Sequence, residues 1–355
     1  MKNLLSQACM IIISMGPVFA QEIEPGSSEE TTNTAIQFSG SADVYYKYDL
    51  SGSPNIGTSF ANDHNSFSLG MFNLIASKTL GKASFVADIG MGPRNASSVG
   101  PSESESQPGI QNLYISYAFT DQLSITAGYM GTFVGYEIIS PTGNFNYSTS
   151  YLFTNGPFQN AGMKIEYAFS DKVALMAGIF DDWNVYQQTP GVNITSFGSQ
   201  LTLSPIEGWD TYLNFITGKN DGMEIDLTTG YQITDQFYLG LNAATWNNAI
   251  DATTDAKFTG AALYVQFAAN ESLAFGARGE MFSSENTGYI GTGITSGLEA
   301  NSVTAFTLSA NIGGGALKFI PEFRIDAASE DVFVDGNLNG TGTATQFLGA
   351  LVYSF

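Results

Sequence analysis

The sequence predicts an all-β fold: a transmembrane antiparallel β-barrel of about sixteen strands, with short periplasmic turns and long external loops. Three observations predict it. Apolar and polar residues alternate along many successive segments, very short turns alternate strictly with longer polar connections, and an export signal precedes the whole array. Alternation at period two is typical of strands. Unequal connections at the two ends of an even number of strands are typical of bacterial outer-membrane barrels.

The first segment resembles a secretory signal peptide. Lys2 supplies a positive charge, residues 8–15 form a short apolar run, and Ala20 follows Pro17 at a site suited to cleavage. The run is too short to span a bilayer as a helix. We expect residues 1–20 to be removed, residues 21–35 to form a polar leader, and residues 36–355 to form the barrel.

Cys9, the single cysteine, lies inside this signal. A lipoprotein anchor at Cys9 is the weaker interpretation, because the cysteine precedes most of the apolar run instead of ending it. Cleavage after Ala20 leaves a chain without thiols, which suits an oxidising periplasm because no wrong disulfide can form.

The composition is unusual for a soluble enzyme. Only 13% of the 355 residues are charged, against about a quarter in a typical globular domain. The chain contains 39 glycines, and aromatic residues make up 13%. The net charge of −21 argues against a nucleic-acid partner, because no basic patch is available to neutralise phosphates.

The connections give the strand count. Short turns are expected near Gly81, Asp121, Asp171, Ile206, Asp235, Asn270 and Gly314. Longer polar connections are expected near residues 50–65, 93–109, 132–157, 184–197, 218–222, 247–256, 283–301 and 328–343. Seven plus eight connections separate sixteen strands. Both ends of the array then lie on the short-turn side.

The two faces of each strand distinguish a membrane barrel from a soluble sandwich. In residues 223–233, for example, one face is apolar and the other carries Glu224 and Asp226. A soluble sandwich also alternates, but sixteen such strands behind a signal peptide favour the membrane. Aromatic residues near strand ends add to this, since they are typical of membrane interfaces; they are Tyr117, Phe119, Tyr167, Phe169, Trp209 and Trp246.

The chain ends on FLGALVYSF, an alternating segment whose last residue is Phe355. In lipid every backbone amide must be paired, so the last strand has to close on the first, residues 36–49. Tyr353 and Phe355 resemble the terminal signal that the barrel assembly machinery recognises in outer-membrane proteins.

One segment, residues 129–184, is similar to the β-barrel porin family described as OmpL-like. The residues that carry the resemblance are Gly135, Tyr136, Glu137, Asn144, Tyr147, Ser148, Ser150, Phe153, Pro157 and Gly162. The resemblance implies a porin-like outer-membrane protein and does not identify a solute.

The search for catalytic and metal chemistry gives two weak candidates. His64, the only histidine, lies beside Asp63 and Ser66, and we interpret it as a solvated loop residue and not as a catalytic base. DGNLNG at residues 335–340 matches the first half of a calcium loop, but position twelve is Gln346 where glutamate is expected. We favour a polar external loop there. We expect no cofactor, no metal and no enzymatic activity.

The third long connection, residues 132–157, is the longest. In many sixteen-strand porins the third loop folds inward and narrows the pore, and we favour that arrangement here over a loop that packs outward across the rim. The residues that we expect to form the constriction are Glu137, Asn144, Tyr147 and Tyr151.

Charged residues on the predicted inner face would line the pore. The acids are Asp43, Asp88, Glu166, Asp210, Glu224, Asp226, Glu280, Glu322 and Asp326. The bases are Lys47, Lys164, Arg278, Lys318 and Arg324. Nine acids against five bases leave an excess of four carboxylates, which predicts a mild preference for cations.

A sixteen-strand barrel is wide enough to leave an aqueous channel. The predicted function is passive diffusion of small hydrophilic solutes and ions across a bacterial outer membrane. The alternative is a surface adhesin or structural barrel with a plugged lumen. The expected partners are outer-membrane lipid, the barrel assembly machinery and the solutes themselves, and a homo-oligomer is compatible with the pattern.

Overall fold

The computed structural model describes residues 35–98, 107–194, 196–249, 255–287 and 300–355. Its strands are β1 (Gln37–Asp49), β2 (Ser66–Leu80), β3 (Ala83–Met91), β4 (Gly109–Ala118), β5 (Leu123–Gly131), β6 (Gln159–Ser170), β7 (Val173–Phe180), β8 (Ser196–Ile206) and β9 (Trp209–Gly218). They continue with β10 (Gly222–Thr234), β11 (Phe237–Ala249), β12 (Asp255–Asn270), β13 (Leu273–Glu285), β14 (Ala300–Gly314), β15 (Leu317–Ala328), β16 (Phe333–Val334), β17 (Gly340–Thr341) and β18 (Thr343–Ser354).

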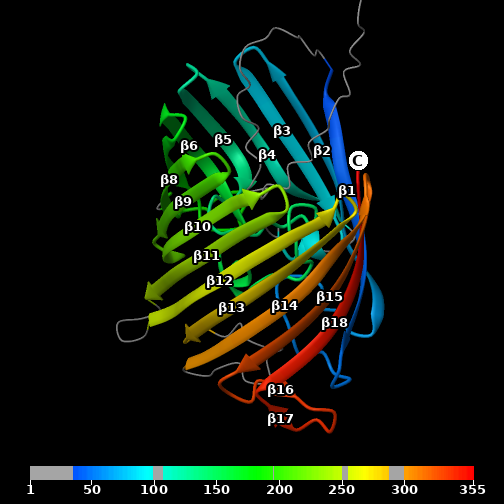
Figure 1. Ribbon diagram of the computed structural model, residues 1–355. Coiled ribbons are helices and arrows are strands. Elements are labelled where there is room, and N and C mark those ends of the chain that lie inside the picture. The colour runs from blue at the N-terminus through cyan, green and yellow to red at the C-terminus, as the bar shows by residue number, and fades with distance from the viewer. Residues whose placement is uncertain (1–34, 99–106, 195, 250–254, 288–299) are drawn as a thin grey trace, which may run out of the picture.

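Sixteen of these strands form one closed antiparallel barrel, in the order β1–β18–β15 and then back through consecutive neighbours to β2 (Figure 1). The two short strands β16 and β17 form a separate hairpin within the last long connection. The predicted fold class and strand number are confirmed. Antiparallel pairing across the short turns follows from their length, which leaves no room for a crossover.

The short turns all lie at one end of the barrel and the long loops at the other, as predicted. We call these the short-turn end and the long-loop end. Glycines with positive φ close two of the short turns, Gly81 at +58° and Gly208 at +77°. Other residues rarely adopt that backbone conformation, so glycine is the natural choice there.

The outer surface of the barrel is apolar. Every second side chain of a strand points away from the lumen, and on these strands the outward side chains are mostly the apolar ones. On β10, Ile225 is 42% exposed, whereas Asp226 beside it is 1% exposed. Five of the six predicted interface aromatics lie on this outer face, and two pairs pack edge to face near the short turns, Tyr117 on Phe119 and Tyr167 on Phe169.

Trp246 was wrongly assigned to that outer set. Its ring stacks on Phe258 inside the barrel, with centroids 5.4 Å apart, and its indole N–H donates to the carbonyl of Asp221 at 2.7 Å. Asn247 beside it points outward and is exposed. Polar residues stand on both faces of this strand end, Asn247 on one and Asn248 on the other, so the local pattern does not show which face is apolar.

The last strand closes on the first, as predicted from the chain end. β18 pairs with β1 from Ser41 opposite Ser354 to Asp49 opposite Gln346. Phe355 extends this ladder, since its N–H and carbonyl both bond to the backbone of Gly40 at 3.0 Å. No edge of the barrel wall is therefore left open to lipid.

The predicted signal peptide and most of the leader, residues 1–34, lie outside the described residues. Within the described part of the chain, no helix is both long and apolar enough to cross a membrane. The two helices there are short and belong to long loops: α1 (Pro93–Ala96) and α2 (Tyr151–Asn155).

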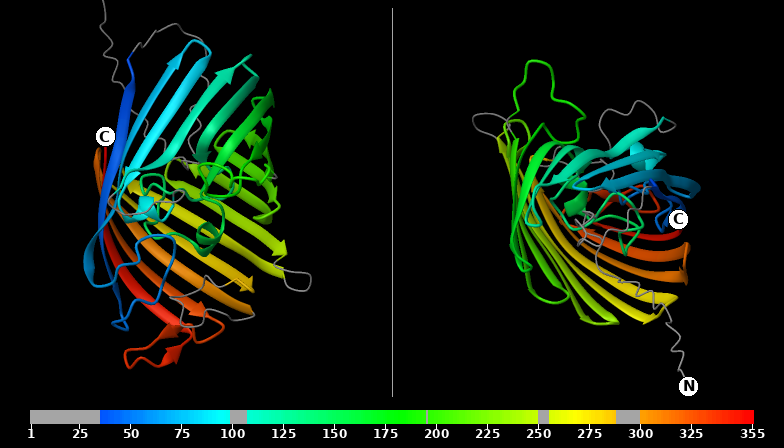
Figure 2. Two further views of the ribbon diagram at one scale, coloured as in Figure 1. Left: turned by 180° about the vertical axis from the view of Figure 1, so that it is seen from behind. Right: turned by 90° about the horizontal axis from the view of Figure 1, so that it is seen from above.

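Loops fill much of the barrel interior (Figure 2). The third long loop and its helix α2 lie inside the ring of strands when the barrel is seen along its opening. Beside β11–β14 and β18, a cluster of buried apolar side chains occupies the lumen. It includes Ile56, Tyr151, Leu152, Phe258, Phe282, Val303, Val332 and Phe333.

Candidate functional site

Loop 3, residues 132–158 between β5 and β6, is the central feature of the lumen. It contacts the wall from β8, where Gln200 Nε2 donates to the carbonyl of Phe133 at 3.1 Å, to β14, where Asn311 Nδ2 donates to the carbonyl of Phe145 at 3.2 Å. The inward fold that we favoured is therefore the one adopted. Carboxylates of the wall hold it there.

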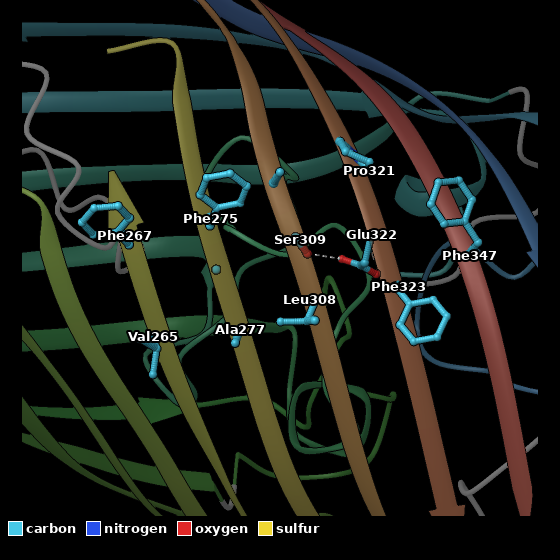
Figure 3. Close-up of a pocket in the computed structure, with 12 residues that line it drawn as sticks. Val265, Phe267, Phe275, Ala277, Leu308, Ser309, Pro321, Glu322, Phe323 and Phe347 are labelled. Atoms are coloured by element: carbon cyan, nitrogen blue, oxygen red, sulfur yellow. Dashed lines mark hydrogen bonds between the residues drawn. The ribbon is translucent and has the colours of Figure 1, made fainter. Parts of the chain in front are cut away.

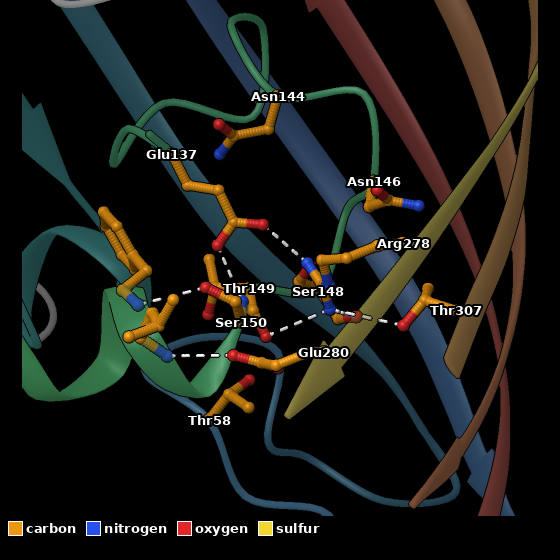
Figure 4. A network of polar contacts seen from close by, with 12 residues as sticks. Thr58, Glu137, Asn144, Asn146, Ser148, Thr149, Ser150, Arg278, Glu280 and Thr307 are labelled. Atoms are coloured by element: carbon orange, nitrogen blue, oxygen red, sulfur yellow. Dashed lines mark hydrogen bonds and ion pairs between the residues drawn. The ribbon is translucent and has the colours of Figure 1, made fainter. Parts of the chain in front are cut away.

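The strongest single attachment joins Arg278 on β13 to Glu137 of loop 3 (Figure 4). Arg278 Nη1 lies 2.6 Å from Glu137 Oε1 and 2.7 Å from the carbonyl of Ser148. Nη2 donates to the carbonyl of Thr149 at 3.3 Å and to Thr307 Oγ1 at 3.3 Å. The guanidinium thus ties three points of loop 3 to two strands.

Three wall carboxylates accept backbone N–H groups of loop 3. Glu322 on β15 accepts from Tyr147 at 2.8 Å and from Ser148 at 3.2 Å. Glu280 on β13 accepts from Leu152 at 3.0 Å. The third, Asp226 on β10, accepts from Gly135 at 3.1 Å. Bonds from N–H groups to an ionised acceptor are stronger than neutral ones, so these contacts fix the path of the loop.

Two loop tyrosines reach further carboxylates. Tyr151 donates to Asp326 at 2.6 Å, and Asp326 also accepts from Arg324 Nε at 2.7 Å. Tyr147 donates its hydroxyl to Asp43 on β1. Asn144, the fourth predicted constriction residue, instead closes a local turn, because its amide bonds both the N–H and the carbonyl of Ile138.

Ten of the fourteen residues predicted to line the pore are buried under loops and neighbouring side chains. They are Asp43, Lys47, Asp88, Glu224, Asp226, Arg278, Glu280, Glu322, Arg324 and Asp326. All ten point inward, as the alternation predicted, but what they meet is protein. Lys47, for example, donates to the carbonyl of Ile56 in the first long loop at 3.1 Å.

The other four predicted residues, Lys164, Glu166, Asp210 and Lys318, are half-buried. They lie toward the short-turn end of β6, β9 and β15, away from loop 3. The structure does not gather them into one cluster. Asp210 accepts from Ser204 Oγ at 2.6 Å on the neighbouring strand.

This division changes the charge balance of the lumen. Among the four half-buried residues, two carboxylates accompany two lysines, so the excess of four carboxylates counted from the sequence lies entirely among the buried ten, which comprise seven acids and three bases. Seven of the nine predicted acids are among the buried ten. Nine acids of the described long-loop end remain in contact with solvent, and five exposed acids lie at the short turns: Asp121, Asp171, Glu207, Asp235 and Glu271.

The alternation of polar and apolar residues does not predict every contact that supports loop 3. Arg94 of α1 is 2% exposed, donates to the carbonyl of Ile139 at 3.2 Å, and lies over the rings of Phe60 and Tyr147. It therefore supports loop 3 from the second long loop. A lone arginine in a polar connection gives no sequence signal for this position.

The first and last long loops are latched together over the barrel mouth. Asn55 Nδ2 donates to the carbonyl of Val334 at 2.8 Å, and the N–H of Val334 donates to Asn55 Oδ1 at 2.9 Å. Val332 and Phe333 beside it are buried in the apolar cluster. The latch joins parts of the chain 279 residues apart, so no local pattern predicts it.

The two weak chemical candidates have structural roles. Nδ1 of His64 accepts the N–H of Asp49 at 3.1 Å, and its ring stacks on Tyr48. Asp335, the first residue of DGNLNG, accepts the N–H groups of Asn337 and Asn339 at 2.8 and 2.9 Å. These bonds lower the pKa of its carboxyl and close the turn between β16 and β17.

One hollow of the described structure lies on the outer wall and not in the lumen (Figure 3). It is an open groove of about 430 Å³ over β12–β15 and β18, and its apolar lining includes Val265, Phe267, Phe275, Leu308, Phe323 and Phe347. The groove faces the lipid side of the wall, so it offers no route for a hydrophilic solute.

Comparison with known proteins agrees with this architecture. Structures similar in fold include OprB of Pseudomonas putida at high pH, with 12% identity, a TM-score of 0.62, and 91% of this chain and 94% of that chain covered. An anion-selective porin from Comamonas acidovorans has 11% identity and a TM-score of 0.61, over 90% of this chain and 99% of that one. The outer-membrane channel DcaP of Acinetobacter baumannii has 11% identity and a TM-score of 0.59, over 90% and 97%.

These identities are low, so the three structures support the fold alone. No curated protein matches the sequence. The model of one protein family, described as "Putative beta-barrel porin-2, OmpL-like", matches residues 35–355. That range covers the whole barrel and includes loop 3. The chain therefore belongs to the OmpL-like family of β-barrel porins.

Proposed function

We propose that this protein is a passive channel of the bacterial outer membrane, through which small hydrophilic solutes and ions diffuse. The observation that carries the proposal is loop 3, which lies inside a closed sixteen-strand barrel and is attached to the wall by buried charged groups. Size-limited diffusion requires a passage narrower than the one that sixteen strands alone would leave. A fixed internal loop provides that narrowing. Membership of a porin family supports this function.

The solute path is proposed to run along β4–β9, toward one side of the lumen. On the opposite side, β12–β15, β18 and β1 contact the buried clusters and the buried attachments of loop 3. Along β4–β6, β8 and β9, several inward side chains toward the short-turn end are polar and half-buried. They include Ser116, Thr126, Lys164, Glu166, Thr202, Asp210 and Tyr212.

A mild cation preference is proposed to arise at the mouth. Solvent-exposed or half-exposed acids of the described long-loop end are Asp63, Asp181, Asp182, Asp221, Asp255, Glu285, Glu330, Asp331 and Asp335, against Lys219 and Lys257. A negative potential at a channel entrance raises the local concentration of cations. Screening restricts it to about 10 Å at 0.1 M salt, so the preference should be strongest in dilute salt.

Cysteine accessibility tests the path, because the chain after residue 20 contains no cysteine. Thr126 on β5 is half-buried and faces the proposed path, whereas Thr307 on β14 faces the lumen with no exposed surface. In a planar bilayer, a charged thiol reagent should reduce the current of Thr126→Cys and leave that of Thr307→Cys unchanged. The opposite pattern would place the path on the other side.

Conductance itself separates the channel from its rival. A plugged adhesin or structural barrel would give no current in a planar bilayer, whereas the proposed channel gives discrete steps. Folding can be checked by comparing the gel migration of the protein before and after boiling. If folded protein shows no conductance, the proposed function is wrong.

Export and assembly complete the proposal. We infer cleavage after Ala20, delivery by the barrel assembly machinery and insertion into outer-membrane lipid, on the basis of the signal-like first segment and the terminal Tyr353 and Phe355. A homo-oligomer is proposed too, since one similar structure, OmpT of Vibrio cholerae with 9% identity, is described as a trimer form. The mass of the native protein in detergent tests the oligomer, and the mass of the mature chain tests the cleavage site.

A further inference from the structure

Glu224 on β10 differs from the other buried acids of the lumen, including Asp226 on the same strand, because no donor bonds to it within the described chain. Glu224 is 3% exposed, yet its Oε2 has no hydrogen-bond partner within the described chain. The other acids that hold loop 3 each accept at least one hydrogen bond: Glu322 accepts from two backbone N–H groups, and Glu280 accepts from Leu152 although its Oε2 is also unpartnered. Neither Glu224 nor Asp226 takes part in an ion pair among the described residues.

Both carboxylates face the same small cavity between β10, β11 and loop 3. Its lining includes Gly135, Leu152, Gly156, Glu224, Asp226 and Asn242. The centre of a water molecule can move within about 10 Å³ of this cavity. The cavity therefore has room for one water molecule or one small ion. The unpartnered carboxylate therefore points into a space that can hold a ligand.

The charges around this cavity are unbalanced. Two carboxylates on alternate residues of one strand face the same side, and an isolated buried carboxylate costs several kcal/mol unless a counter-charge or proton compensates it. Asp226 is partly compensated by N–H groups, from Asn214 at 2.6 Å and Gly135 at 3.1 Å, and by the amide of Asn242. Glu224 has no such donor, so the ligand that fits is positive.

We propose that Glu224 and Asp226 bind a small hard cation, of the class of Ca²⁺ or Na⁺, in this cavity beneath loop 3. Carboxylate and carbonyl oxygens are the donors that such ions prefer. The carbonyl of Leu152 lines the same corner, because a Cβ placed on Gly156 would lie 3.6 Å from that oxygen and 3.7 Å from Glu224 Oε1. The site is distinct from the exposed DGNLNG turn.

The cation would act on the position of loop 3. Both ends of the loop contact this corner of the wall: Gly135 bonds to Asp226, and Gly156 and Pro157 line the cavity beside Glu224. Neutralising the two carboxylates removes their repulsion and holds the two ends of the loop against β10. Binding should therefore stabilise the folded barrel, since a ligand that binds only the native state raises its stability.

The test uses mature protein refolded in detergent without lipopolysaccharide, stripped with EDTA and then dialysed free of the chelator. The temperature at which the folded band is lost should rise with CaCl₂ in a saturable way. Parallel series with MgCl₂ and NaCl show which hard cation fits. No rise with any of the three salts in the wild-type protein would overturn the proposal.

Three variants locate the effect. Glu224→Gln should lose the cation-dependent rise and, without cations, unfold at the wild-type temperature or higher, because a repulsive charge is gone. Glu166→Gln, on the open wall of β6, and Asp335→Asn, in the DGNLNG turn, should keep the full rise. An unchanged rise in Glu224→Gln, or its loss in Asp335→Asn, would contradict the assignment.

A direct measurement covers the case in which Glu224→Gln fails to fold. Tb³⁺ binds calcium sites and emits when aromatic side chains nearby are excited, and Trp246 and Tyr136 both lie inside the barrel. Titration of the wild-type protein and of Asp335→Asn should reveal one site that CaCl₂ displaces in both. Absence of sensitised emission, or its loss in Asp335→Asn, would rule the buried site out.

Discussion

Arg278 on β13 and Glu137 in loop 3 form an ion pair of 2.6 Å, and neither side chain has more than 4% of its surface exposed. The two residues are 141 positions apart in the sequence. Such a pair contributes little net stability compared with an apolar pair of the same shape, but removing one partner leaves a buried charge without compensation. The pair therefore fixes where loop 3 lies across the lumen.

Glu137→Gln should destabilise the barrel by about 3–5 kcal/mol, because it strips the buried guanidinium of its counter-charge. The same change should increase current noise in a planar bilayer, since loop 3 loses its central attachment. Thermal unfolding in detergent measures the first effect. Glu285→Gln is the matched control: its pair with Lys257 spans 2.7 Å but is exposed, so its loss should leave the unfolding temperature nearly unchanged.

Ion selectivity should depend on the mouth more than on the wall. Replacing Glu330, Asp331 and Asp335 by their amides should shift the zero-current potential across a KCl gradient toward zero. Glu166→Gln on the wall should shift it less, because it removes one negative charge where the mouth variant removes three. A potential whose sign indicates chloride preference in the wild type would contradict the mouth argument and leave the barrel unaffected.

The terminal Phe355 should matter for assembly in the cell and not for closure of the barrel. Its backbone bonds to Gly40, while its ring is 53% exposed on the outer face. Phe355→Lys should therefore lower the amount of folded protein in outer membranes. Phe355→Trp, which keeps an aromatic ring, should leave that amount at the wild-type level. Refolding of both variants in detergent should match the wild type; a refolding defect confined to Phe355→Lys would show that the ring acts on stability and not as a signal.

The external loops should loosen as the pH rises from about 4 to about 6. Burial and the nearby charge of Asp182 together raise the pKa of Asp221 to about 6, although the N–H of Trp183 donates to its carboxylate and acts in the opposite direction. The folded state then binds this proton more tightly than the unfolded state, whose Asp pKa is about 3.9. Its contribution to stability is therefore fully present below about pH 4 and is lost as the pH rises through 6.

Asp221→Asn should remove that dependence, because the amide cannot ionise and its oxygen can still accept the N–H of Trp183. Hydrogen exchange of residues 181–183 at several pH values measures the loosening. Wild-type exchange, corrected for its intrinsic pH dependence, should increase between pH 4 and pH 6, whereas the variant should stay flat. The same increase in both proteins would assign the effect to another group.

Local patterns in the sequence are enough to predict the wall of this barrel. Alternation from Met223 to Ile233, turns such as those at Gly81 and Asp121, and the apolar ending at Phe355 are local patterns, and strand direction, pairing of neighbours and facing of side chains follow from them. Inward orientation of all fourteen charged residues was predictable for the same reason. The resemblance in residues 129–184 also pointed to the family.

The packing inside the lumen follows only from the tertiary structure. Whether Glu322 meets water or the backbone of Tyr147 depends on a loop 175 residues away in sequence, and the latch between Asn55 and Val334 spans 279 residues. Strand periodicity says which side of the wall a residue faces but not what lies opposite. The physical reason is that loop packing is set by long-range contacts between side chains and backbone groups, whereas strand facing is set by the pleat of the chain itself.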